Sequence, residues 1–326
     1  MLIFYFQYLS VYMNSQYVFM LIGFILASYS VIANDAIQTI GTFLSSNQER
    51  RWWVLWLFAC SILLVVFIYS WSTNSGDLAY GRLEKFPFPE HFNWIYIVPP
   101  IALIFLTNLG IPVSTTFLIL TTFAPENITD MLIKSLSGYG IAFLTAILVY
   151  NLLTKSLEDK FINTPYEEPP IQWVVLQWSS TGFLWSQWLI QDMANIFVYL
   201  PRNLNAGMLF FSILVILIFC AFIFYEKGGK IEEIVTIKTN TQDIRSATIL
   251  DFIYGLILLL FKEWSKIPMS TTWVFLGLLA GREVAITYNF QHREMKETGK
   301  MIFSDALKAF AGLGVSVLIA FGLPHN

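Results

Sequence analysis

Two aspartates, Asp35 and Asp192, lie near the middle of long apolar segments and have carboxamide side chains beside them. An ionised carboxylate at the centre of a bilayer costs at least about 2.5–3.5 kcal/mol, so such a residue persists where it faces a cavity and has a partner. Residues four apart share one helical face, which brings amide oxygens next to each carboxylate. This pattern predicts a site for Na⁺, or a carboxylate that carries a proton. The residues expected to bind the ion are Asn34, Asp35, Gln38, Gln191, Asp192 and Asn195.

A second polar motif, Pro-x-Ser-Thr-Thr, begins at Pro112 and again at Pro268. Proline is favoured in the first turn of a helix, so each motif predicts a helix N-terminus inside the membrane. Free backbone N–H groups and the positive end of the helix dipole make such a terminus an anion site. Two such termini that converge would surround a tetrahedral oxyanion with hydroxyl groups. The residues expected to bind it are Ser114, Thr115, Thr116, Ser270, Thr271 and Thr272.

The two motifs together predict coupling between an anion and a cation. An anion next to two carboxylates is repelled unless a cation or protons lie between them. Two simpler interpretations exist: the aspartates and amides join helices by hydrogen bonds, and the Ser/Thr clusters only cap helices. The presence of both motifs in both halves of the chain favours the binding sites.

The composition is that of a membrane protein. Of the 326 residues, 56% are hydrophobic and 13% are charged, whereas soluble domains carry roughly 25% charged residues. The net charge of −3 gives no basis for a nucleic-acid partner. We therefore expect the lipid bilayer to be the environment of most of the chain.

The apolar runs predict the elements that position these motifs. A spanning helix needs about 20 apolar residues. Runs of this kind occupy 17–46, 52–71, 128–154, 170–203, 206–225 and 301–323, and polar residues within 17–46 and 170–203 predict broken helices there. Two interrupted stretches, 94–122 and 247–280, predict re-entrant hairpins with part-length arms. Polar linkers are expected at 72–93, 155–169, 226–246 and 281–300.

An internal repeat organises these elements. The Asp35 and Asp192 motifs, and the two Pro-x-Ser-Thr-Thr motifs, recur in the same order and at almost the same spacing. The predicted fold is an all-α integral membrane protein with two inverted-topology repeats. Each repeat has three spanning helices, the first of them broken, plus a re-entrant helical hairpin. Residues 1–154 form the first repeat, 155–169 a polar cytoplasmic linker, and 170–326 the second repeat.

Lys and Arg side chains predict the orientation. On this topology most of them fall on one face, and the opposite face has only Arg82, Lys85, Lys134 and Arg202. The face rich in Lys and Arg is the cytoplasmic one. We therefore expect a multi-pass protein of the cell (plasma or inner) membrane with both termini on the outer face.

In these motifs the chain resembles the inorganic phosphate transporter (PiT) family of Na⁺- or H⁺-coupled symporters, as a divergent member. That family carries a repeated Gly-Ala-Asn-Asp-x-Ala-Asn signature and a repeated Pro-x-Ser-Thr-Thr motif in inverted halves. Here Ile32, Gln38 and Gln191 depart from the first signature. The resemblance implies that the Asp and Asn residues bind the coupling ion and the Ser/Thr hairpins bind phosphate.

The function predicted from the sequence is symport of phosphate, or a related tetrahedral oxyanion, with Na⁺ or H⁺ by alternating access, without an organic cofactor. The alternatives are a sulfate permease of the same fold, a membrane-embedded enzyme that uses the Asp35/Asp192 pair, a passive anion channel and a structural subunit. The sequence does not distinguish phosphate from sulfate or Na⁺ from H⁺. It also leaves open whether the protein is a homodimer and what Lys262, Glu263 and Lys266 do.

Overall fold

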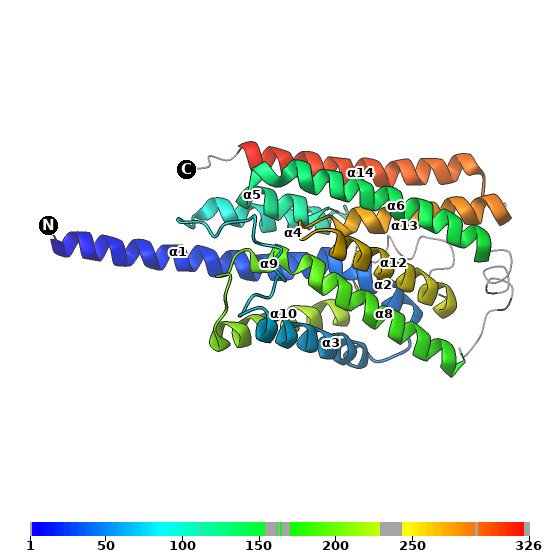
Figure 1. The fold of residues 1–326 in the computed structure, drawn as a ribbon, viewed down its shortest axis with the longest axis horizontal. Coiled ribbons are helices and arrows are strands. Elements are labelled where there is room, and N and C mark those ends of the chain that lie inside the picture. The colour runs from blue at the N-terminus through cyan, green and yellow to red at the C-terminus, as the bar shows by residue number, and fades with distance from the viewer. Residues whose placement is uncertain are drawn as a thin grey trace.

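The computed structural model describes residues 2–111, 113–153, 161, 164, 170–228, 243–290 and 293–322. Every regular element within these ranges is a helix, and most helices run along the long axis of the molecule (Figure 1). Many large apolar side chains on these helices are exposed, as a bilayer allows and water does not. Six segments are long and apolar enough to cross a bilayer: Ser15–Ser46, Trp52–Thr73, Pro125–Leu152, Ala206–Tyr225, Ile244–Trp264 and Met295–Gly322. The prediction of an all-α membrane protein is confirmed.

The long helices alternate in direction along the chain. Outside the two hairpins the described elements are α1 (Leu2–Val31), a π-helical turn (Ile32–Ala36), α2 (Ile37–Ser46), α3 (Trp52–Thr73), a 3₁₀ turn (Pro125–Asn127), α6 (Ile128–Leu153), α8 (Ile171–Asp192), α9 (Ala194–Phe197), α10 (Ala206–Tyr225) and α14 (Met295–Gly322). Helix α1 begins and α14 ends at the same end of the molecule (Figure 1). Apart from Phe161 and Thr164, the linker expected at 155–169 lies outside the described residues.

The first hairpin has part-length arms, as predicted. A short 3₁₀ turn (Trp94–Ile97) leads into α4 (Val98–Asn108), and the chain turns at Gly110, which has a positive φ of 69°. Pro112 lies outside the described residues. The return arm holds a second π-helical turn (Thr116–Leu120) and the short α5 (Thr121–Phe123). Residues 113–123 are buried almost throughout.

The second hairpin has longer arms than predicted. Its helices are α12 (Ile244–Trp264, 21 residues) and α13 (Thr271–Phe290, 20 residues), and they meet near the middle of the molecule (Figure 1). The side chain of Asp243 accepts a hydrogen bond from the Arg245 N–H at 2.8 Å, which starts α12 before the apolar run. Helix α13 continues through Arg282 and Glu283, whose buried side chains lie 3.5 Å apart. The polar linker expected at 281–300 is therefore mostly helical.

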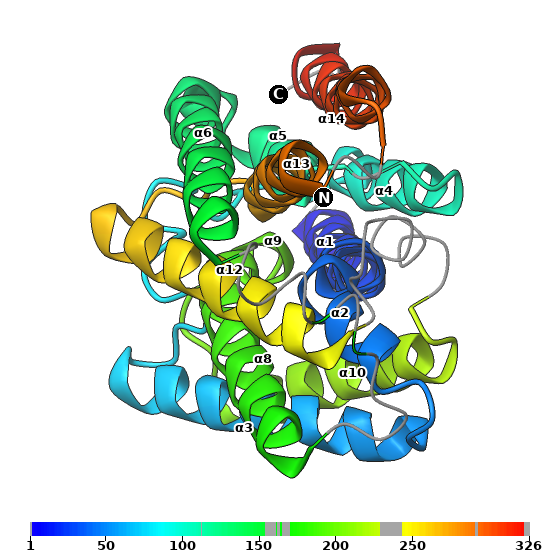
Figure 2. The same cartoon turned by 90° about the vertical axis from the view of Figure 1, so that its right-hand side faces the viewer.

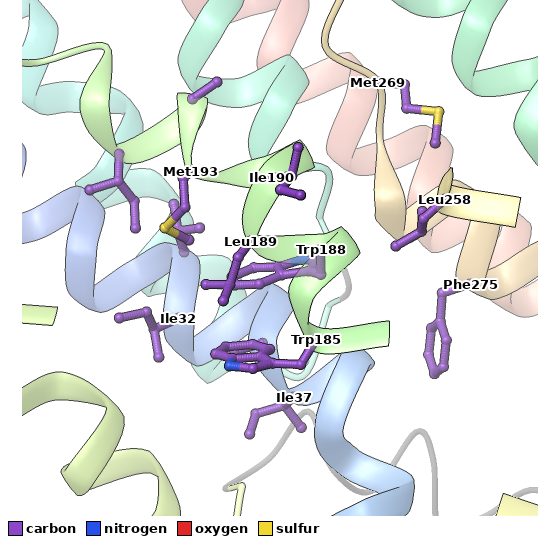
Figure 3. Packing of buried hydrophobic residues seen from close by; sticks show 14 of the residues in the cluster. Ile32, Ile37, Trp185, Trp188, Leu189, Ile190, Met193, Leu258, Met269 and Phe275 are labelled. Carbon is purple, nitrogen blue, oxygen red and sulfur yellow. The ribbon is translucent and has the colours of Figure 1, made fainter. Parts of the chain in front are cut away.

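Aromatic side chains of α8 fill the core next to the interrupted first helix. The rings of Trp185 and Trp188 are stacked, with centroids 4.8 Å apart and an angle of 9° between their planes. Figure 3 shows them beside Ile32, the first residue of the π-helical turn, and Ile37, the first residue of α2. The Trp185 indole also donates to the Ala59 carbonyl of α3 at 2.9 Å. This packing holds α8 against both α3 and the α1–α2 segment.

Helices α6 and α13 pack with their backbones in close contact. A Cβ atom added to Gly277 would overlap the Tyr139 carbonyl oxygen, and one added to Gly281 would overlap the Phe143 carbonyl oxygen. Small residues allow membrane helices to approach this closely. The second hairpin is thereby fixed by α13 to α6, while its other arm, α12, packs along α8. Figure 2 shows α12 crossing α8 and α13 lying beside α6.

Candidate ion and anion site

The backbone around Asp35 is a π-helical turn. The sequence predicted a broken helix here, but the chain stays helical from α1 to α2, and only the turn Ile32–Ala36 is wider than an α turn. The Thr39 hydroxyl donates to the Asp35 carbonyl oxygen at 3.2 Å, which compensates for the altered backbone bonding. Single π turns inside α-helices are frequent at functional sites. Asn34 and Asp35 are both buried there.

The backbone at Asp192 is interrupted over one residue. Helix α8 ends at Asp192 and α9 begins at Ala194, while Met193 between them keeps right-handed helical angles (φ −62°, ψ −21°). The Met193 carbonyl accepts hydrogen bonds from the Ile196 and Phe197 N–H groups at 3.0 and 2.9 Å. The two aspartates therefore lie at two different kinds of irregularity in long helices, and both are fully buried.

The hairpin tips meet at this level of the molecule and bond to each other. The Thr116 hydroxyl donates to the Met269 carbonyl at 3.1 Å, and the Thr272 hydroxyl donates to the Val113 carbonyl at 3.3 Å. Thr116 and Thr272 hold equivalent positions in the two motifs, and so do Val113 and Met269. Each tip therefore donates the same kind of bond to the other. The predicted convergence of the two motifs is therefore present.

The serines of both motifs cap the return arms. The Ser114 hydroxyl accepts from the Phe117 N–H, and the Ser270 hydroxyl accepts from the Trp273 N–H, each at 3.3 Å. This is the ordinary capping geometry at a helix N-terminus. Capping thus accounts for the serine oxygens in this structure, and it leaves the threonines to be explained.

Each carboxylate accepts a hydrogen bond from a threonine of the neighbouring motif. The Thr115 hydroxyl donates to Asp35, and the Thr271 hydroxyl donates to Asp192. Asn195 joins the two clusters, because its side-chain NH₂ group lies 2.9 Å from the Thr115 hydroxyl and 3.3 Å from an oxygen of Asp192. All twelve residues predicted for the two sites are buried, and these bonds join five of them, Asp35, Thr115, Asp192, Asn195 and Thr271, in one cluster.

The carboxamide oxygens next to the carboxylates have no donors. Among the described residues, the side-chain oxygens of Asn34, Gln38, Gln191 and Asn195 are buried without a hydrogen-bond partner. The NH₂ group of Gln191 is fixed at 2.9 Å from the Leu258 carbonyl, and that of Asn34 at 2.6 Å from the Val113 carbonyl. Buried polar atoms without partners are rare, so each needs an explanation. Ligation of a cation by these oxygens is such an explanation.

The two carboxylates also interact electrostatically with each other. Two negative charges in a buried site repel, unless a proton or a cation is bound there. Four carboxamide residues within three positions of these carboxylates have buried side-chain oxygens without donors, and hard oxygen ligands of this kind suit Na⁺. The residues present therefore fit the ion that the sequence analysis assigned to them.

Two buried cations lie on one side of this cluster. Arg82, in the loop outside the spanning helices, donates to the Ile190 carbonyl at 2.9 Å and interacts electrostatically with Asp192. Burial lowers the pKa of the Arg82 guanidinium to about 10, which leaves it charged at neutral pH. Lys134 of α6 donates to the Ser265 and Ile267 carbonyls of the second hairpin, both at 2.7 Å. Lys134, which the sequence analysis places on the outer face, thus bonds to the tip of this hairpin.

The side chains near the second hairpin tip, whose role the sequence left open, form surface ion pairs. Lys266 lies 2.6 Å from Glu84, and both side chains are about two-thirds exposed. Lys262 lies 3.4 Å from the neighbouring Glu263. Exposed pairs of this kind contribute little to stability. None of these three residues is within the buried cluster.

Sequence reasoning missed a third buried carboxylate, Asp251 of α12. Its two oxygens accept hydrogen bonds from Thr42 of α2 and Thr181 of α8, each at 2.5 Å. A signal existed, since Asp251 is an acidic residue inside an apolar run, as Asp35 and Asp192 are. Asp251 does not belong to a repeated motif, because it has no equivalent in the first half of the chain.

The fold is similar to one known transporter. A solved structure described as "The sodium-dependent phosphate transporter" aligns with a TM-score of 0.61 and 15% identity, over 95% of this chain and 98% of that chain. The chain has the fold of that transporter. No family model and no curated protein matches the sequence. The fold and the six apolar helices make this chain a multi-pass membrane protein.

Proposed function

We propose that this protein is a secondary active transporter that carries phosphate, or a related tetrahedral oxyanion, together with Na⁺ by alternating access. One observation carries the proposal. Two buried carboxylates each accept a hydrogen bond from a threonine of a hairpin tip, and four carboxamide residues within three positions of them in the sequence have buried side-chain oxygens without donors. The neighbour of the same fold is described as a sodium-dependent phosphate transporter, which supports both the ion and the substrate class.

The amide and carboxylate residues would bind the coupling ion. Asp35 would ligate it with Asn34 and Gln38, and Asp192 would do so with Gln191 and Asn195. The unpaired oxygens of the four amides support this assignment. Both carboxylates lack a buried Lys or Arg among the hydrogen-bond partners described for them, so a bound cation would balance their charge.

The hairpin tips would bind the anion. The threonine hydroxyls now bonded to carboxylates and carbonyls are groups that can rotate to donate to an oxyanion. Ser114 and Ser270 would act with the N-terminal N–H groups of the return arms. The anion would lie close to Asp35 and Asp192, so its binding would be favourable only with the cations in place. This interdependence is the physical basis of symport.

We further propose two inverted repeats, 1–154 and 170–326, joined by the cytoplasmic linker 155–169. The reciprocal bonds between the hairpin tips support this division, because equivalent threonines reach equivalent carbonyls. The shared end of α1 and α14 supports placing both termini on one face (Figure 1), which the Lys and Arg distribution makes the outer face of the cell membrane. A homodimer is an option that these observations leave open.

The test is uptake of labelled phosphate into proteoliposomes, with and without an inward Na⁺ gradient, for wild type and Asp192→Asn. We expect uptake that requires Na⁺ and is lost in the variant. Asp130→Asn is the matched control, since Asp130 is a half-exposed carboxylate paired with Lys85 at 3.3 Å. If a proton gradient alone drove uptake, the coupling ion would be H⁺ and not Na⁺. Transport of sulfate in place of phosphate would correct the substrate, and no flux of either anion would refute the proposal.

A membrane-embedded enzyme remains the alternative of a different class. It would use Asp35 and Asp192 as a catalytic pair, but each carboxylate accepts a hydrogen bond from a threonine hydroxyl and lies within three residues of two carboxamides whose oxygens have no donors. This arrangement favours ion binding. Recovery of the labelled anion from the vesicles in unchanged form would exclude the enzyme.

A further inference from the structure

Asp251 lies away from the central cluster and joins three helices. It is 1% exposed and stands on α12, while its hydrogen-bond donors Thr42 and Thr181 stand on α2 and α8. Thr42 follows Asp35 by two helical turns, and Thr181 precedes Asp192 by three, at 3.6 residues per turn. Asp251 therefore lies about 10–16 Å along the molecule from the central carboxylates.

The ligands around Asp251 differ from those around the central carboxylates. Within three residues of Asp35 and of Asp192 lie carboxamides whose buried oxygens have no donors and are available to ligate a metal cation. The groups described at Asp251 are two hydroxyls, and both donate to it at 2.5 Å. One carboxylate and two hydroxyls are too few for the six or so oxygen ligands that hard cations prefer. A proton needs only one oxygen.

The elements packed against α12 bring no described cation into contact with Asp251. Helix α2 has no titratable residue, and α8 contributes Asp192, three turns away. The charged and titratable residues on the other packed elements and on α12 itself are Asp130, Lys134, Tyr139 and Tyr150 on α6, Arg282, Glu283 and Tyr288 on α13, and Arg245, Tyr254, Lys262 and Glu263 on α12. Lys134 is bound to carbonyls at the hairpin tip, Arg245 to Asp243, and Arg282 to Glu283.

We propose that Asp251 is a proton-binding site, separate from the two central carboxylates, whose occupancy controls how firmly α12 is held to α2 and α8. A buried carboxylate that receives two charge-assisted hydrogen bonds holds three helices together. The same carboxylate is costly to keep ionised in a buried site without a cation, so the site can exist in both forms.

Proton binding changes the bonding in a defined way. When one carboxylate oxygen takes a proton, it becomes a donor, and the threonine hydroxyl opposite it must rotate and accept. The other threonine continues to donate, now to a neutral group. Threonine in a helix can turn its hydroxyl toward the carbonyl three or four residues earlier, so either threonine can make this change. The two helix contacts then weaken from charge-assisted to neutral hydrogen bonds.

The test is infrared difference spectroscopy of the purified full-length protein in lipid, in Na⁺-free buffer, between about pH 5 and about pH 9. We expect a carboxylic-acid C=O band that is lost as the pH rises and is missing from Asp251→Asn. Thr181→Val should keep the band and shift its frequency, because one hydrogen bond to the group is removed. Asp130→Asn should leave the band unchanged, since Asp130 is exposed.

Three results would overturn the proposal. If Asp251→Asn removes no band at any pH, Asp251 stays ionised. If the band it removes is the same at both pH values, the residue stays protonated. If Na⁺ added at constant pH abolishes the band, the site takes a metal cation. These measurements need no transport, so they remain informative if the proposed function is wrong.

A role for this proton in transport rests on the proposed function and has its own measurement. We expect the ratio of wild-type uptake to Asp251→Asn uptake to change at least about fivefold between the two pH values. The ratio removes the effect of pH on phosphate itself, because both proteins are given the same phosphate species at each pH. A constant ratio, together with a titrating band, would leave the proton site in place and remove it from the transport cycle.

Discussion

The two helical hairpins have nearly the same tip and different arms. Both tips carry Ser-Thr-Thr with a capping serine, a threonine on a carboxylate and a threonine on the opposite tip. The arms of the first are α4 and a short return segment that contains a π-helical turn. Those of the second are two regular helices of 21 and 20 residues. The bonding of the tips is similar, whereas the scaffold that supports them differs.

The features that the two tips share are those that ion binding requires, and the arms are the part of the fold that can differ. A tip needs a helix N-terminus and hydroxyls at fixed spacing, and either kind of arm provides them. Asp251 and the close packing of α13 on α6 exist only on the second hairpin. We therefore expect tip substitutions to act alike in both halves and arm substitutions to act in one.

The largest effect should come from the carboxylates. Asp35→Asn and Asp192→Asn should each lower Na⁺-driven phosphate uptake by at least about 100-fold, because each removes the charge that binds the ion. Initial rates in proteoliposomes across a range of Na⁺ concentrations would measure this. If one variant retained most of its activity, the two sites would not be equivalent, and the comparison between the tips would fail.

The arms should differ most in stability. Gly281→Ala places a methyl group against the Phe143 carbonyl and should destabilise the protein by about 1–3 kcal/mol. Gly140→Ala on α6 is the matched control, since no atom lies within 4 Å of the added carbon. Thermal unfolding of the purified proteins in the same detergent would compare them. Equal melting temperatures would contradict the close contact of α6 and α13.

The threonines that bind the carboxylates should have a smaller effect. Thr115→Val and Thr271→Val should each weaken Na⁺ binding by about 10-fold, as loss of a hydrogen bond to an ion ligand does. Thr115→Ser and Thr271→Ser keep the hydroxyl and should retain the wild-type affinity. The Na⁺ dependence of uptake would show the change as a shift of the half-saturating concentration. A loss of maximal rate alone would argue against this role.

The exposed pair near the second tip should matter least. Lys266→Ala removes the contact with Glu84, and exposed ion pairs contribute about 0–1 kcal/mol. We expect uptake within about twofold of wild type at physiological ionic strength. A larger loss, measured alongside Glu84→Ala, would place this pair in the path of the anion.

Much of the site could be predicted because its residues appear twice. Asp35 and Asp192 are recognisable as costly residues in apolar runs, and repetition distinguishes them from single structural groups. Repetition also hid Asp251, which has no equivalent. The bonds of Thr115 and Thr271 to the carboxylates could not be predicted, since they depend on how the hairpins fold back onto α2 and α8.

The interruptions of the helices were harder to predict than their positions. Polar residues in a long apolar run indicate an irregularity, but the same pattern produced a π-helical turn at Asp35 and a break at Asp192. The long arms of the second hairpin were missed because Arg282 and Glu283 look like loop residues until they are seen to pair inside α13. Buried ion pairs within a helix leave no signature in hydrophobicity.

The close contact of α6 and α13 has a mechanical consequence. With no side chains between the backbones at Gly277 and Gly281, these helices cannot slide or rotate past each other without overlap. We therefore expect α6 and α13 to move as one unit. Lys134 of α6 also donates hydrogen bonds to two carbonyls of the hairpin tip. We therefore expect a displacement of the tip to move α6 together with α13. The shape of their backbones couples these two helices.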